Sequence, residues 1–165
     1  MNSKFLESER LILKPLSFKE LVYIKDNDIS NIEIEAVSNS VKSAVSKKLS
    51  KMKYIGSEFH EWYTYWLIIS KNNEKGIGFI GFKGLPDENG YLEVGYSISP
   101  NHRKKRIMTE ALKTLVTWAS EFQDCRGIIA RVLKSNIGSH KVLTNCNFKV
   151  NSSNEEENNY TLKLK

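Results

Sequence analysis

Cysteine and proline are scarce in this sequence, whose 165 residues include two cysteines and three prolines. Cys125 and Cys146 stand in unrelated contexts without a Cys-x-x-Cys pair, which argues against a zinc site or a disulfide framework. We therefore expect two free thiols and no bound metal. No Pro/Gly/Ser-rich linker divides the chain, so we expect a single domain over residues 1–165.

Long apolar runs are also missing. No run approaches the ~20 residues that a membrane-spanning helix needs. The first residues lack an apolar stretch of the length found in secretory signals. These observations predict a cytoplasmic protein that does not engage a membrane.

Acidic residues are absent between positions 36 and 57, although this stretch holds five lysines, Lys42, Lys47, Lys48, Lys51 and Lys53. A second basic cluster spans positions 103–106, and the net charge is +6. A basic balance fits an anionic ligand or nucleic acid, but it also fits a solvated surface. No recognised nucleic-acid motif is present, so nucleic acid is the less favoured partner.

Hydrophobic periodicity predicts an α+β (α/β) fold with a mixed, mostly antiparallel sheet of six to seven strands and about four helices. Ser17 precedes Phe18 with Glu20 three residues later, as in a capping box that opens a helix. The expected helices cover residues 18–25, 41–54, 107–122 and 136–145. The expected strands cover residues 11–14, 65–69, 76–84, 91–98, 127–133, 148–150 and 160–164.

The segment from Glu93 to Leu112 reads as a strand, a basic loop and an amphipathic helix. A helix start directs unpaired backbone N–H groups outward, which makes this order a candidate anion site. Period-2 alternation puts Leu92 and Val94 on the core face of the strand and Glu93 on the opposite face. In the strand over 127–133, a run of two isoleucines and an alanine predicts burial on both faces.

Four segments together resemble the GNAT superfamily of acetyl-CoA-dependent N-acetyltransferases, and most closely its ribosomal-protein-alanine N-acetyltransferase branch. They cover residues 8–16, 76–81, 92–111 and 136–148, in the order that this branch shows. The resemblance departs from the family pattern at Lys104, Arg106 and Asn147, because each stands where the family commonly has glycine. A long side chain at Arg106 could clasp a phosphate, or it could lie across the loop and block it.

The resemblance implies transfer of an acetyl group from acetyl-CoA, as co-substrate, to a primary amine without a covalent enzyme intermediate. Glu93 would be the general base and Ser139 a candidate acid. The backbone near Ile98 would hold the thioester carbonyl. The implied cofactor contacts come from Arg103, Lys104, Lys105, Arg106, Ile107, Met108, Asn136 and Lys141.

The aromatic run over residues 59–66 includes the two candidates for substrate binding, Trp62 and Tyr63, although core packing explains such a run equally well. For Glu93, pairing with a neighbouring lysine is the structural alternative, and for Ser139 it is an ordinary helix serine. The acceptor would be a small molecule or a protein N-terminus, and a homodimer is left open. The rival functions are an acyl-CoA-binding or partner-binding protein of the same fold without activity, and a nucleic-acid-binding module.

Overall fold

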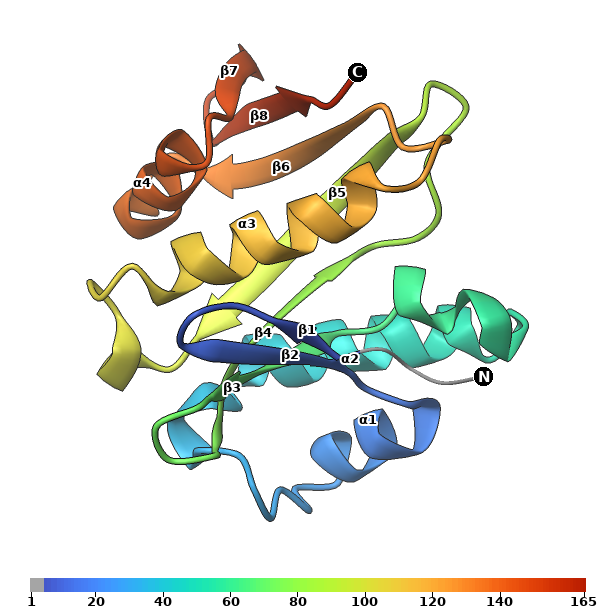
Figure 1. The fold of residues 1–165 in the computed structure, drawn as a ribbon, viewed down its shortest axis with the longest axis vertical. Helices are drawn as coiled ribbons and strands as arrows, with labels where there is room; N and C mark the ends of the chain where they lie inside the picture. The colour runs from blue at the N-terminus through green and yellow to red at the C-terminus, as the bar shows by residue number, and fades with distance from the viewer. Residues whose placement is uncertain (1–4) are drawn as a thin grey trace.

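The computed structural model describes residues 5–165, and within them an eight-stranded sheet carries helices on both faces (Figure 1). The strand order is β1-β2-β3-β4-β5-β6-β8-β7. The strands are β1 (Leu6–Glu7), β2 (Leu11–Pro15), β3 (Trp66–Ser70), β4 (Gly76–Phe82), β5 (Tyr91–Ile98), β6 (Gly127–Leu133), β7 (Lys149–Ser153) and β8 (Glu157–Lys163). The α-helices are α1 (Phe18–Lys25), α2 (Asn39–Met52), α3 (Ile107–Ser120) and α4 (Ile137–Asn145). Short 3₁₀ helices are η1 (Ile34–Ala36), η2 (Ser57–Trp62) and η3 (Pro100–His102).

The predicted mixed sheet is confirmed. Neighbouring strands from β1 to β5 pair antiparallel, whereas β5 and β6 pair parallel and are joined by α3. A parallel pair requires such a crossover, since a tight turn cannot return the chain to the same end of the sheet. The sheet gains its eighth strand from β1, which has two residues and is too short to produce a readable alternation.

Local signals set the helix boundaries. The capping box of α1 forms as predicted, because Ser17 accepts from the backbone of Glu20 while the Glu20 side chain accepts from the backbone of Ser17. The apolar stripe of α3 is buried against the sheet, with Ala111, Leu112 and Leu115 fully inaccessible. Burial of this stripe, rather than helix propensity alone, holds α3 in place.

Separate apolar clusters lie on the two faces of the sheet. One packs α3 and α4 against residues such as Ile80, Leu92 and Val94. The other packs α1 and α2 against β3 and β4 through Leu67 and Phe79. In Figure 1, α3 accordingly crosses in front of the sheet and α2 lies behind it.

The prediction that the strand now labelled β6 is buried on both faces is wrong. Ile128, Ala130 and Val132 are buried, but Arg131 and Leu133 are exposed. The second apolar cluster draws no residue from β6, β7 or β8, so among the described residues this part of the sheet has one covered face. The other face is open to solvent beside Glu93.

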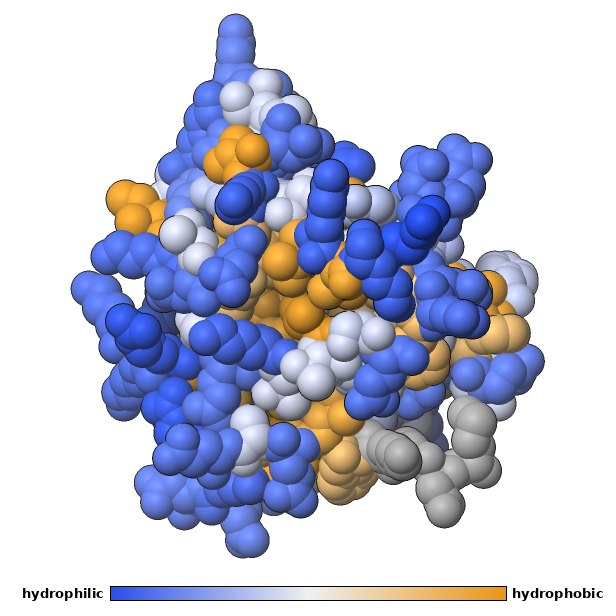
Figure 2. Space-filling model, turned by 45° about the horizontal axis from the view of Figure 1, so that its top comes forward, coloured by the Kyte–Doolittle hydropathy of each residue, from blue (hydrophilic) through white to orange (hydrophobic). Residues whose placement is uncertain are grey.

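No helix in residues 5–165 is long and apolar enough to cross a membrane. On the face shown in Figure 2, hydrophobic surface is gathered in a central area that hydrophilic side chains surround. Both cysteines are free, as expected, and both are buried.

Candidate active site

The parallel strands β5 and β6 pair only at their beginnings. The pairs are Tyr91 with Gly127, Leu92 with Ile128 and Glu93 with Ile129. Beyond these pairs, β5 continues beside β4 alone and β6 beside β8 alone. We call this divergence, from Glu93 and Ile129 onward, the β5–β6 fork (Figure 1).

Backbone groups of β5 point into the β5–β6 fork. The N–H of Ser99 donates to Ile77 and the C=O of Glu93 accepts from Lys83, so odd-numbered residues of β5 direct their backbone toward β4. Because successive residues of a strand alternate, Tyr96 and Ile98 direct their N–H and C=O groups toward the fork. A ligand lying in the fork could therefore pair with these groups as an added strand would.

The loop between β5 and α3 has the backbone shape of a glycine-rich loop although it contains no glycine. Lys104 has φ 64° and Arg106 has φ 60°, both in the left-handed region that glycine enters without strain. Asn147, after α4, has φ 67°. These are the three positions at which the sequence departs from the family pattern, so the departures change side chains while the backbone keeps the conformation that glycine favours.

The start of α3 has no side-chain cap. Arg106 occupies its N-cap position and makes no capping hydrogen bond through its side chain. The first N–H groups of an α-helix have no partner inside the helix, and the helix dipole adds partial positive charge there. Arg103, Lys104, Lys105 and Arg106 are all exposed, whereas Ile107 and Met108 are buried and anchor the first turn.

A polar network fixes this loop to the beginning of β2. Glu110 accepts hydrogen bonds from the Ser8 hydroxyl and from the backbone and side chain of Arg10. Burial alone would raise the pKa of Glu110, but these hydrogen bonds and the Arg10 charge together hold it below its ordinary value. Arg10 also donates to the C=O of Lys105 at 3.0 Å, which ties the loop backbone directly to the network.

A cavity of about 510 Å³ adjoins the loop on the β2–β3 side, and Lys105 and Ile107 are among its lining residues. Arg10, Lys71 and His102 also border it, but each already has a carboxylate partner. Arg10 pairs with Glu110, Lys71 with Glu7 and His102 with Glu33. Among the described residues, the loop's free positive charge therefore belongs to the side chains at positions 103–106.

Residues at the start of α4 face the other branch of the β5–β6 fork. Asn136 is the N-cap, and its side-chain oxygen accepts from the N–H of Ser139 at 3.2 Å. The phenol of Tyr96 reaches from β5 to the C=O of Ser139 at 3.4 Å. Burial raises the pKa of Tyr96 to about 12, so its hydroxyl keeps its proton at neutral pH.

The neighbours of Ser139 on α4 have different surroundings. Lys141 is exposed. His140 lies within 3.1 Å of the C=O of Leu133 through Nε2 and within 2.6 Å of the Tyr160 hydroxyl through Nδ1. A carbonyl can only accept, so Nε2 donates its N–H to Leu133. His140 thus fastens α4 to β6 and β8.

Glu93 lies at the base of the β5–β6 fork, on the face away from α3, as alternation predicted. Its carboxylate is 2.7 Å from the Nζ of Lys83 and 3.8 Å from the Nε of Arg131. Sequence reasoning anticipated a lysine partner but not its identity, and it missed Arg131 entirely. The hairpin register of β4 and β5 could have indicated Lys83, whereas Arg131 comes beside Glu93 only through the parallel pairing across α3.

The two aromatic candidates are separated by the fold. Trp62 is buried on the α3 face, where its ring lies 4.6 Å from that of Trp118 and 4.8 Å from that of Phe122. Tyr63 is half-buried and contacts both apolar clusters. The structure therefore brings Tyr63 near β4 and its loop but places Trp62 in the core, away from Glu93.

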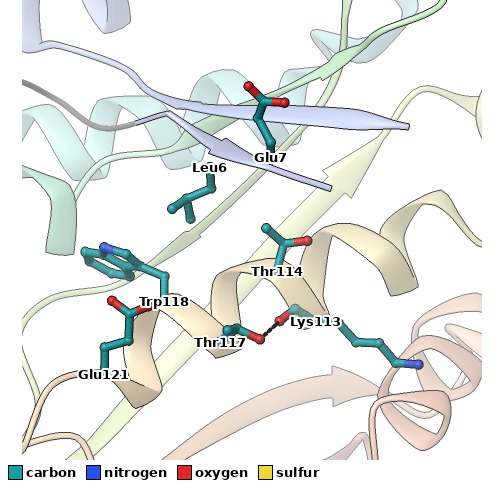
Figure 3. Close-up of a pocket in the computed structure, with 7 residues that line it drawn as sticks. All are labelled: Leu6, Glu7, Lys113, Thr114, Thr117, Trp118 and Glu121. Carbon is teal, nitrogen blue, oxygen red and sulfur yellow. Dashed lines mark hydrogen bonds between the residues drawn. The ribbon is translucent and has the colours of Figure 1, made fainter. Parts of the chain in front are cut away.

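Another cavity is separate from the β5–β6 fork and from the loop before α3. It encloses about 300 Å³ between β1 and the outer side of α3, and none of the predicted site residues lines it (Figure 3). Within residues 5–165, no group of three or more histidine, cysteine or acidic side chains is arranged to hold a metal ion.

Comparison with known proteins identifies the class to which this fork and loop belong. Residues 10–149 match the acetyltransferase (GNAT) domain, so the chain belongs to the GNAT acetyltransferase family. It is 37% identical over 91 residues, 55% of this chain and 54% of the relative, to the uncharacterized N-acetyltransferase YjdG of Bacillus subtilis (strain 168). The matching part spans about half the length of the curated relatives.

Solved structures share the fold over nearly the whole chain. The ribosomal-protein-S5-alanine acetyltransferase of Vibrio fischeri has a TM-score of 0.69 at 19% identity, covering 97% of this chain and 96% of that one. RimL, a ribosomal L7/L12 α-N-protein acetyltransferase solved with coenzyme A, has a TM-score of 0.70 at 15% identity, covering 97% and 98%. At these identities the similarity establishes the fold.

Proposed function

We propose that this chain transfers the acetyl group of acetyl-CoA to a primary amine by direct attack. The observation that carries the proposal is the loop at positions 103–106, which keeps a glycine-like backbone and leads into an uncapped helix start beside the β5–β6 fork. Family membership supports the same reaction. The structural similarity to ribosomal-protein acetyltransferases makes a protein N-terminus one candidate acceptor, beside small-molecule amines.

The residues present fit acetyl-CoA. The first N–H groups of α3, together with Arg103 and Arg106, would hold the pyrophosphate. The inward-facing backbone of Tyr96 and Ile98 would pair with the extended arm of the cofactor, with Asn136 and Lys141 contributing from α4. When bound, acetyl-CoA supplies a thioester whose carbonyl carbon forms the new C–N bond as the C–S bond breaks.

The chain's own groups would manage charge and protons in this reaction. An ammonium ion has no lone pair, so Glu93 would accept, through water, the proton that the amine must lose. The N–H of Ile98 would donate to the carbonyl oxygen as negative charge develops there. Ser139, half-buried on α4, would supply a proton to the sulfur.

The proposal is tested by following thiol release from acetyl-CoA in the presence of a panel of amines that includes peptides with free N-termini. Acetyl transfer should require an amine, and the acetylated product should be identified by mass spectrometry. The rival function, acyl-CoA binding without catalysis, would show acetyl-CoA binding but no thiol release with any amine.

A further inference from the structure

The base of the β5–β6 fork holds more positive than negative charge. The Nζ of Lys83 pairs with Glu93 at 2.7 Å, and the Nε of Arg131 lies 3.8 Å from the other oxygen of the same carboxylate. Lys51, at the end of α2, donates to the C=O of Lys83 at 3.4 Å. Burial chiefly lowers the pKa of Lys48, and the positive charges of Lys83 and Lys51 lower it further.

These cations share one acid. Among residues 5–165, Glu93 is the sole carboxylate within 4.0 Å of Lys51, Lys83 or Arg131. Lys83 and Arg131 therefore share one carboxylate, and Lys51, which bonds the backbone of Lys83, has no carboxylate of its own within that distance. The strand register adds Lys149 to the same face, because Lys149 pairs with Thr161, Thr161 with Ile129 and Ile129 with Glu93.

One acid further along this face offsets part of that excess. Glu157 pairs with Leu133, two residues beyond Arg131 on β6. It makes no ion pair within 4.0 Å in the part of the chain that the structure describes. The excess around Glu93 therefore remains positive.

The face is also accessible. The side chains of Lys83 and Arg131 are 52% and 58% exposed, and Leu133 next along β6 is 54% exposed. The helices that cover this side of the sheet, α1 and α2, pack on β3 and β4. A substrate can therefore approach Glu93 across β6 and β8 and meet these cations first.

We propose that the acceptor is an amine that carries carboxylate groups, selected by Lys51, Lys83 and Arg131. This inference rests on the proposed acetyl transfer. A cationic acceptor such as a polyamine would be repelled at this face, whereas carboxylates near the amine would pair with the unmatched cations. The same cations would lower the pKa of an amine held among them, which increases the fraction with a free lone pair.

The test compares two tetrapeptide amides that share a free N-terminal alanine, one followed by two aspartates and the other by two asparagines. Free aspartate and asparagine form a second pair that distinguishes a small acidic amine from an acidic N-terminus. An exposed ion pair contributes about two- to fivefold, so kcat/KM for the acidic peptide should exceed that for the neutral one about five- to tenfold. The preference should shrink in 0.5 M salt because exposed charges are screened.

Lys51→Gln and Arg131→Gln should each reduce the acidic-to-neutral ratio about two- to fivefold. Lys113→Gln is the matched control, since Lys113 is an exposed cation on α3, on the other side of the sheet (Figure 3). Equal use of the two peptides, an unchanged ratio in both variants, or the same loss in Lys113→Gln would overturn the inference. If no amine is acetylated, the proposed function fails. Calorimetric titration of the two peptides then still decides the inference, which requires the acidic peptide to bind more tightly.

Discussion

Lys104 and Arg106 adopt the same left-handed backbone conformation on either side of Lys105, with φ values of 64° and 60°. A residue with a Cβ pays about 1–2 kcal/mol for this conformation. The network of Arg10 with Glu110 and the C=O of Lys105 holds the loop in place against that strain. The backbone of the loop thus keeps a shape that would let a phosphate come close to it. The long cationic side chains of the loop are exposed to solvent.

Arg106→Gly should leave the free energy of unfolding within about 1 kcal/mol of the wild type, because relief of strain offsets the greater freedom of glycine in the unfolded chain. The same change should weaken acetyl-CoA binding about fivefold, since one charged phosphate contact is lost. Calorimetric titration and urea denaturation measure the two quantities. Tighter binding by Arg106→Gly would mean that the side chain blocks the loop.

Glu93→Gln should lower kcat/KM about 100-fold, because a general base contributes on the order of that factor or more. The Kd for acetyl-CoA should stay the same, since Glu93 lies at the base of the β5–β6 fork and not at the loop. Glu88→Gln, at an exposed carboxylate between β4 and β5, is the control. Full activity of Glu93→Gln would contradict the role of general base and leave Glu93 only its ion pairs with Lys83 and Arg131.

The lowered pKa of Lys48 makes the stability of the fold depend on pH. Its Nζ donates to the C=O groups of Tyr63 and Phe82 at 3.0 Å each, and burial, with the charges of Lys83 and Lys51, lowers its pKa from 10.5 to about 7. Between these values the unfolded chain binds more protons at this residue than the folded chain. Raising the pH through this window therefore stabilises the fold, by up to about 1.4 kcal/mol per pH unit.

The measurement is the free energy of unfolding in urea at pH 7, 8 and 9 for the wild type and for Lys48→Met. The difference between wild type and variant should grow in favour of the wild type as the pH rises. Other titrating groups are common to both proteins and cancel. Parallel pH profiles would show that Lys48 has an ordinary pKa.

Trp62→Ala should cost about 3–5 kcal/mol of stability, because its ring fills the core between Trp118 and Phe122. Tyr63→Phe keeps the ring and should cost far less. Urea denaturation of both variants checks this. If Trp62→Ala lowers the free energy of unfolding by less than about 1 kcal/mol and raises the KM for the amine, Trp62 contacts the substrate instead.

Much of the fold could be predicted from the sequence because its elements carry local signals. The helix over 18–25 and the strands over 91–98 and 127–133 match the structure residue for residue, since capping, alternation and short apolar runs act over a few positions. The position of Glu93 on the face away from α3 followed from the same alternation. The two-residue strand β1 carries no such signal and was missed.

What could not be predicted depends on contacts between distant segments. Arg131 stands beside Glu93 because the parallel pairing of β5 and β6 sets Ile129, two residues before Arg131, opposite Glu93. No local pattern in the sequence encodes that register. The aromatic run near Trp62 is ambiguous for the same reason, since its direction is set by packing against α3. The left-handed conformation of Lys104 and Arg106 was also hidden, because these residue types rarely adopt it.

Thermal unfolding with and without acetyl-CoA tests the central claim most directly. At a concentration 100 times the Kd, the ligand should add about 2.7 kcal/mol to the free energy of unfolding and raise the Tm by several degrees. The shift should shrink in a variant that carries glutamine at both Arg103 and Arg106. An unchanged Tm at millimolar acetyl-CoA would contradict the account.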